Sequence, residues 1–526
     1  MDSLFLNAKV LTMDPGNPRA GAIAVRDGRI LAVGSEDLAR SAVRGDALVH
    51  DLRGQCVVPG MIDSHVHLVG FGHALRSIDL RDAKSIQDIK DAVLERVKST
   101  HPGEVISGRG WDQEKLRERR YPNRHDLDEV APDNPVLLAR VCGHVVCLNS
   151  KALRLVSIDA DTPDPPNGEI VREGHTREPH GLLKEAAAEM AWSAAMRPSD
   201  RQIVEAAELA CRELAKFGLT TVHFMSATWP EVRALMHLRD VQGLPIRVRL
   251  YVGEGDLDRT RAELREDNML RLCGVKVLMD GSLGARTALL SEPYSDEPST
   301  MGMETVDEKK AEQLFERVHR AGLQLAIHSI GDEATKRALD LIGRVLNRNP
   351  KHEHRHRIEH ASVLNDNLIS RMKELELVAS VQPHFVITDF WVVGRVGADR
   401  AKHVYAFRSL RDAGVIVAAG SDCPVEPPSP ILGIKAAVTR GEEQGIELSK
   451  VTPRERLNPI EALEMYTRAG ALASHEEDLI GSLRAGALAD FVVLSGDPTT
   501  CDPAQLDNLR VKMTVVNGKV VHCSPD

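Results

Sequence analysis

Short apolar runs that end in a residue able to bind a metal ion recur along this chain of 526 residues. Continuous apolar runs are typical of strands that are buried on both faces of a sheet. Five of these runs lead into His65 with His67, Lys276, His328, His360 and Asp422. A (β/α)8 barrel places its active-site residues at the carboxyl ends of its strands. The pattern therefore predicts such a barrel, with a metal-dependent hydrolytic centre at that end.

Between about residues 55 and 475 the strand-like runs alternate with amphipathic segments, which indicates a parallel α/β fold. The helices expected from the spacing of apolar residues are 86–99, 200–217, 309–321, 332–346 and 459–469. Prolines and charged residues interrupt the alternation between about 76 and 200. We interpret that stretch as an insertion after the first barrel strand, and we expect it to cap the mouth of the active site.

The two ends of the chain are rich in strand-forming residues and contain hairpin turns. Asp27-Gly28 separates two apolar runs near the start, and Asn517-Gly518 separates two near the end. Because an isolated hairpin is only marginally stable, we expect the ends to pack together. The sequence thus predicts a composite β-sandwich domain from residues 1–57 and 476–526, with the barrel domain at 58–475.

Composition narrows the partners that the chain is expected to have. Aromatic residues make up only 3% of the chain and its net charge is −10, which disfavours nucleic acids and anionic membranes as partners. No apolar stretch reaches the roughly 20 residues needed to span a bilayer, and the first residues lack the features of a signal peptide. The eight cysteines are scattered without a Cys-x-x-Cys motif, so we expect them to be reduced. These features predict a cytoplasmic enzyme with a small-molecule substrate, and they leave open whether it forms a homo-oligomer.

Each candidate ligand also has an ordinary structural interpretation. His65 and His67 lie on the same face of a strand and could share one cation, although a lone His-x-His motif is a weak signal. His328 or His360 alone could be a histidine at the end of a strand. Asp422 could cap the next helix. A buried Lys276 needs a partner or neutralisation, so it is either ion-paired with Asp280 or Glu359 or chemically modified.

Taken in order, the motifs resemble those of the amidohydrolase superfamily, in particular its amidohydrolase 3, or YtcJ-like, branch. The resemblance covers nearly the whole chain. The segments that carry it are 58–67, 110–112, 275–284, 327–332, 357–361, 381–384, 420–425 and 481–490.

This resemblance implies a (β/α)8 barrel with a flanking β-sandwich and a centre of two metal ions, usually zinc. In such a centre His65, His67 and Asp422 would hold one ion. His328 and His360 would hold the other, and a Lys276 carboxylated by carbon dioxide would bridge the two. Zinc lowers the pKa of a bound water to about 7, so hydroxide becomes available to attack a polarised carbonyl. Asp422 is the expected proton shuttle between the nucleophile and the leaving nitrogen.

Other residues are candidates for contact with a substrate. They are Trp111, His144, Asp280, Arg286 and His384. Arg286 could clamp a carboxylate or form a structural ion pair. His352, His354 and His356 resemble a metal-binding tract, but their charged surroundings favour solvated loop residues. His180 and His223 depart from the pattern expected for the family.

Three functions are compatible with these patterns. The first is hydrolysis of a carbon–nitrogen bond other than a peptide bond, with simple N-acyl or N-formyl amides as the expected kind of substrate. The second is a mononuclear zinc deaminase of an aminated heterocycle, in which Lys276 is structural. The third is a non-catalytic barrel with a binding or regulatory role, which the intact set of ligands disfavours. The native metal stays open between zinc, manganese, iron and nickel.

Overall fold

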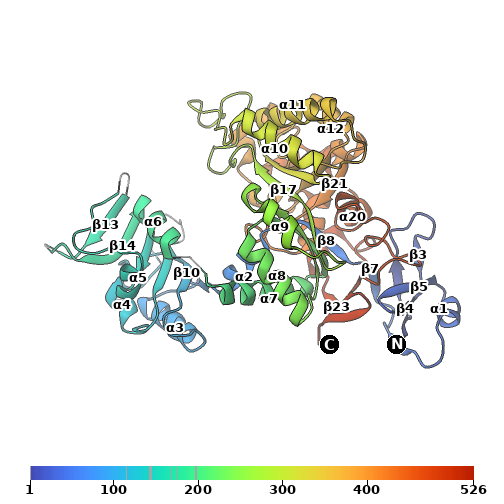
Figure 1. The fold of residues 1–526 in the computed structure, drawn as a ribbon, viewed down its shortest axis with the longest axis horizontal. Coiled ribbons are helices and arrows are strands. Elements are labelled where there is room, and N and C mark those ends of the chain that lie inside the picture. Colours follow the sequence, from blue (N-terminus) through green and yellow to red (C-terminus); the bar gives the residue numbers. More distant parts are fainter. Residues whose placement is uncertain are drawn as a thin grey trace. The chain divides into compact units, whose positions relative to one another are not determined.

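The computed structural model describes residues 2–113, 115–140, 145–165, 168–174, 176–195 and 198–525. These residues form two compact units (Figure 1). The first unit contains Met1–Phe71 and Ala207–Asp526, and the second contains Gly72–Ala206.

The centre of the first unit is a sheet of eight parallel strands in chain order. The strands are β8 (Met61–Val66), β15 (Leu219–Ala227), β16 (Arg247–Val252), β17 (Leu270–Leu278), β18 (Gln324–Ser329), β19 (Arg357–His360), β20 (Val378–Val381) and β21 (Ile416–Ala419). Beyond the last strand the chain returns to the first, because the Asp422 N–H donates to the His65 carbonyl and the His67 N–H donates to the Cys423 carbonyl. The predicted (β/α)8 barrel is confirmed.

Amphipathic helices follow the strands, as their spacing predicts. In α10 (Glu308–Arg320) the Asp307 side chain accepts a hydrogen bond from the Lys310 N–H and caps the helix. The buried face of α10 includes Leu314 and Val318, and it packs against β18.

Four of the five predicted helices agree with the structure within a few residues. They are α3 (Ile86–Val97), α7 (Asp200–Lys216), α10 and α11 (Asp332–Arg348). The fifth is divided at Tyr466 and Thr467 into α19 (Pro459–Met465) and α20 (Arg468–Ala473). In Figure 1, α10 and α11 lie on the outside of the barrel next to α12 (Asp366–Glu374).

Strands from both ends of the chain build two further sheets in the first unit. One has the order β5 (Arg29–Gly34), β4 (Ala22–Arg26), β1 (Ser3–Leu6), β6 (Leu48–Asp51). The other has the order β24 (Lys519–Cys523), β23 (Val511–Val516), β22 (Phe491–Leu494), β7 (Cys56–Pro59), β2 (Lys9–Leu11), β3 (Arg19–Ala20). Phe5 and Phe491 belong to one buried core, where their rings meet edge to face at 4.8 Å. Residues near the two termini therefore share a core.

The second unit has its own six-stranded sheet. Its order is β13 (Gly168–Arg172), β14 (Pro179–Glu185), β12 (Val145–Leu148), β11 (Val136–Arg140), β10 (Ile106–Trp111), β9 (Ile78–Asp79). One apolar core includes residues of α3 and the other includes residues of α6 (Ala186–Ala195). Because successive residues of a strand point to opposite faces, Leu138 joins the first core and Leu137 the second. No helix in the described part of either unit is long and apolar enough to cross a membrane.

Candidate metal centre

Histidine nitrogens and a carboxylate converge at the carboxyl end of the barrel. The ligand atoms of His65, His360 and Asp422 lie within 4.8 Å of one another, and all three residues are buried. His67 joins them, with its Nε2 3.2 Å from Asp422 Oδ1. The Oδ1 atom of Asp63 accepts hydrogen bonds from the backbone N–H groups of His65 and Ser421, and so holds the two segments side by side.

Glu359 fixes the orientation of the His65 imidazole. Its Nδ1 lies 2.6 Å from Glu359 Oε2, so Nδ1 carries the proton and Nε2 is left as the acceptor. That Nε2 lies 3.5 Å from Asp422 Oδ1 and 3.2 Å from Lys276 Nζ. Burial, with the positive charge of Lys276, lowers the pKa of His65 well below its ordinary value. The imidazole is therefore neutral and suited to a metal ion.

Lys276 is the group that most needs an explanation. It lies inside β17, is buried, and has no carboxylate within 4 Å among the residues that the structure describes. Burial lowers the pKa of its amine to about 8. Glu359 is instead held by Arg357, and Asp280 by backbone N–H groups. Neither of the two ion pairs considered for Lys276 is present.

His328 and His360 leave one ring nitrogen each for a ligand. The Nδ1 of His360 is 2.7 Å from Gln382 Oε1, and the Nε2 of His328 is 3.0 Å from the Gly281 carbonyl oxygen. The free nitrogens are thus Nε2 of His360 and Nδ1 of His328. The two rings lie 4.4 Å apart between their centroids. Burial lowers the pKa of His328 to about 4, so this imidazole is neutral as well.

The arrangement fits a divalent metal ion. Asp422 Oδ1 is buried, and the nitrogens recorded near it are those of two other candidate ligands, His67 Nε2 at 3.2 Å and His65 Nε2 at 3.5 Å. His360 and Asp422 both have left-handed backbone conformations, with φ of 74° and 59°. Strain of this kind costs about 1–3 kcal/mol per residue and is typical of functional sites. Imidazole and carboxylate ligands suit zinc and its neighbours in the first transition series.

Two of the predicted substrate-contact residues are buried and have hydrogen-bond partners within the protein. Trp111 has no exposed surface in the core of the second unit, where its Nε1–H donates to the Leu138 carbonyl. Asp280 is buried and accepts from the N–H groups of Leu289, Ile330 and Gly331, so it anchors loops. Both residues therefore have structural roles, and their contact with a substrate stays a prediction.

The remaining candidates differ in their surroundings. Arg286 forms an ion pair with Asp296, as in the structural alternative. His384 follows β20 and is paired with Glu426. His144 lies outside the described residues.

A buried network behind the ligands was missed from the sequence. Arg357 donates to both oxygens of Glu359, to the Ser64 carbonyl and to Ser380 Oγ. The signal was present, because two opposite charges, Arg357 and Glu359, stand two residues apart in a buried strand. His223 also belongs to this network, since its Nδ1 is 2.7 Å from Arg357 Nη1.

His354 and His356 correct another interpretation. Both are buried rather than solvated, and His356 Nε2 is 2.9 Å from His319 Nδ1. Their ring nitrogens are taken by hydrogen bonds, so they form a structural cluster and not a metal-binding tract. Only His352 is exposed as expected.

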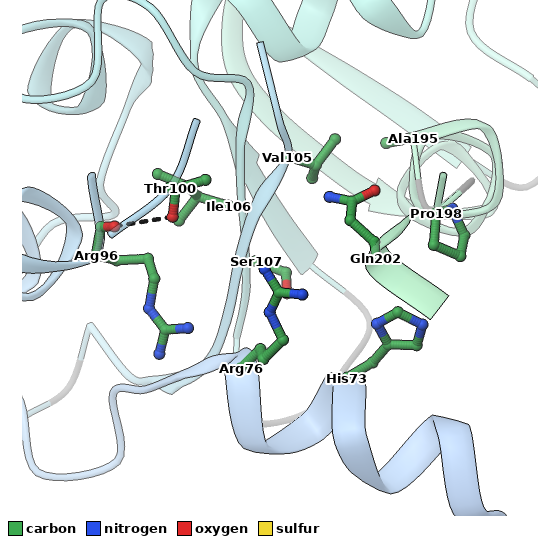
Figure 2. A pocket seen from close by; sticks show the side chains of 10 residues that line it. All are labelled: His73, Arg76, Arg96, Thr100, Val105, Ile106, Ser107, Ala195, Pro198 and Gln202. Atoms are coloured by element: carbon green, nitrogen blue, oxygen red, sulfur yellow. Dashed lines mark hydrogen bonds between the residues drawn. The ribbon is translucent and has the colours of Figure 1, made fainter. Parts of the chain in front are cut away.

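The second unit contains a separate cavity of about 200 Å³ (Figure 2). Arg76, Arg96 and His73 lie on its wall together with apolar side chains. Arg76 is paired with Glu205 at 2.8 Å. No carboxylate is among its lining residues in the described part of the chain, so the cavity does not resemble a metal centre.

Comparisons with known proteins found similar sequences and structures. The sequence model described as "Amidohydrolase family" matches residues 48–522. The Bacillus subtilis protein YtcJ, whose name refers to amidohydrolases, is 35% identical over 99% of both chains. N-substituted formamide deformylase of Arthrobacter pascens is 31% identical over 98% of this chain and 97% of its own. The crystal structure of an uncharacterized metal-dependent hydrolase from Pyrococcus horikoshii covers 96% of this chain and 99% of its own, with a TM-score of 0.82 and 34% identity.

Proposed function

Because this chain belongs to the amidohydrolase family, we propose that it hydrolyses a non-peptide amide bond at a centre of two divalent metal ions. The observation that carries the proposal is the cluster of neutral imidazoles, a buried lysine with no carboxylate within 4 Å among the described residues, and the carboxylate of Asp422. A barrel without catalysis has no physical reason to keep these costly groups together.

We assign the ligands as the family resemblance implies. His65, His67 and Asp422 would hold one ion, and His328 and His360 the other. Lys276 would bridge them as a carbamate. The depressed pKa of its amine supports this role, because carbon dioxide reacts with a neutral amine and not with an ammonium group. Zinc is the metal that we propose, given the nitrogen and oxygen ligands.

When bound, the ions would lower the pKa of a water molecule to about 7 and polarise the amide carbonyl. Asp422 would accept the proton that the attacking water loses, since its carboxylate lies among the candidate ligands, with Oδ1 3.2 Å from His67 Nε2 and 3.5 Å from His65 Nε2. Glu359 and Gln382 would hold His65 and His360 in place while this occurs.

The substrates that we propose are formyl and other short N-acyl amides of primary amines. Support comes from the similarity over nearly the whole chain to the Arthrobacter pascens protein, whose name refers to N-substituted formamides. The test substrate is therefore the formyl amide of benzylamine, with release of the amine as the readout.

Metal content tests the proposal first. We expect about two ions per chain by ICP-MS for protein expressed with bicarbonate and candidate metals, and fewer for Lys276→Ala. Lys336→Ala is the matched control, because Lys336 is an exposed lysine on α11. One ion in the wild type would instead favour the mononuclear deaminase. No tightly bound ion under any condition would contradict the proposed function.

A further inference from the structure

His384 and Glu426 form a pair at the carboxyl end of the barrel. His384 Nδ1 lies 2.5 Å from Glu426 Oε2. The two residues come from different loops, one after β20 and the other after β21. The carboxylate of Glu426 is 6% exposed, whereas the imidazole of His384 is 19% exposed. The pair therefore has a buried acid and an imidazole that solvent can reach.

The loops after β20 and β21 both contact proposed metal ligands. Gln382, two residues before His384, accepts from His360 Nδ1, and the ring of Phe385 lies 6.4 Å from the ring of His360. On the other side, the Val425 N–H donates to the Asp422 carbonyl and so fixes the turn that leads to Glu426. These contacts connect the loops that carry His384 and Glu426 to the proposed ligands His360 and Asp422.

The hydrogen bond to Glu426 fixes the chemistry that His384 can perform. With Nδ1–H donated to the carboxylate, Nε2 is the nitrogen left for another partner. No residue in the described ranges hydrogen-bonds to this Nε2. A buried carboxylate that accepts from Nδ1 holds the imidazole in one orientation, and a positioned proton donor needs such an orientation.

We infer that His384 is the general acid of the proposed amide hydrolysis and that Glu426 positions it. The inference rests on the proposed function. When the tetrahedral adduct breaks down, the carbon–nitrogen bond would break and its electron pair would remain on nitrogen. That nitrogen would take the proton from His384 Nε2 and leave as a neutral amine. Solvent would then reprotonate His384, and the proton accepted by Asp422 would return to solvent, so each turnover consumes one water molecule.

The dependence on the leaving group separates this role from a structural one. The formyl amide of benzylamine must be protonated as it leaves, whereas the formyl amide of para-nitroaniline can leave with little help. For His384→Asn we expect kcat/KM to fall about 10²–10⁴-fold on the first and less than about tenfold on the second. Glu426→Gln should show the same selectivity with a smaller loss.

The matched control is His352→Asn, because His352 and Glu376 form a histidine–carboxylate pair that is exposed, with Nδ1 3.3 Å from Oε1. This variant should leave both rates unchanged. Equal losses on both amides in His384→Asn would overturn the inference but not the proposed function. If the wild type cleaves neither amide, the proposed function is wrong and the inference falls with it.

A second readout does not depend on activity. The Nδ1–H of His384 should give a low-field proton resonance in the NMR spectrum of histidine-labelled protein. We expect it to disappear in His384→Asn and to shift upfield in Glu426→Gln, because a neutral amide accepts a weaker hydrogen bond than a carboxylate. A resonance that Glu426→Gln does not move would overturn the assignment of Glu426 as the positioning residue.

Discussion

Glu359 decides which nitrogen of His65 is available to a metal ion. Its carboxylate lies 2.6 Å from Nδ1 and is itself held by Arg357. Loss of such a partner costs roughly 10–100-fold in metal affinity in known sites. We therefore expect Glu359→Gln to weaken zinc binding by about that factor, measured by competition with a chromogenic chelator. Glu374→Gln, at an exposed position, should bind zinc as the wild type does. Unchanged affinity in Glu359→Gln would show that His65 is held in other ways.

Lys276 gives a second prediction at this scale, which concerns pH. The pKa of its amine is lowered by burial to about 8, against an ordinary value of 10.5. Below pH 8 the amine is mainly charged, and it becomes neutral as the pH rises through that value. Carboxylation needs the neutral amine, so reconstitution of metal-free protein should give more of the two-ion form as the pH is raised from about 6 to about 8. Labelled bicarbonate and carbon NMR would detect the carbamate, and loading independent of pH would contradict this account.

At the scale of elements, α10 and the segment before β19 meet through buried histidines. His319 belongs to α10, and His354 and His356 precede the strand. Burial lowers the pKa of His354 to about 4, from an ordinary 6.5. The unfolded chain then binds more protons than the folded one between these values, so the stabilising contribution is present above pH 6.5 and is lost as the pH falls toward 4.

The prediction is that His354→Gln reduces the loss of stability on acidification. Urea midpoints of metal-free protein at about pH 7 and about pH 5 should differ less in the variant than in the wild type, because one titrating group has been removed. His352→Gln, at an exposed position, should show the wild-type difference. If the wild type and His354→Gln lose stability equally, the cluster does not control the acid response.

The elements themselves could be predicted from the sequence, because period and capping are local properties. The strands that carry His65, His328 and His360 were expected from apolar runs, and they form in the barrel. The helix predicted at 459–469 was not expected to divide, because the interruption lies in the backbone at Thr467, whose φ is −130° and ψ is −95°. No pattern of apolar residues reports such a local change.

The sequence predicted which candidate ligands would come together at the carboxyl end of the barrel, but not the contacts behind them. The contact between His65 and Glu359 joins residues 294 positions apart, and its partner is chosen by the barrel geometry and not by nearby sequence. The surroundings of Trp111 could not be predicted either. Its short motif resembles a functional element, but the ring is enclosed by its own sheet and helices. Long-range packing decides which residues contact one another, and these contacts cannot be predicted from the local pattern of a single sequence.

At the scale of the whole molecule, the two units have separate means of stabilisation. The second unit has two apolar cores, one on each face of its sheet, whereas every proposed metal ligand belongs to the first unit. An ion that binds only folded protein adds about 2.7 kcal/mol of stability at a hundred times its Kd, and only to the unit that binds it. We expect two calorimetric transitions, of which zinc raises one. In Asp422→Asn zinc should move neither midpoint appreciably, while a single transition that zinc shifts as a whole would show that the units unfold together.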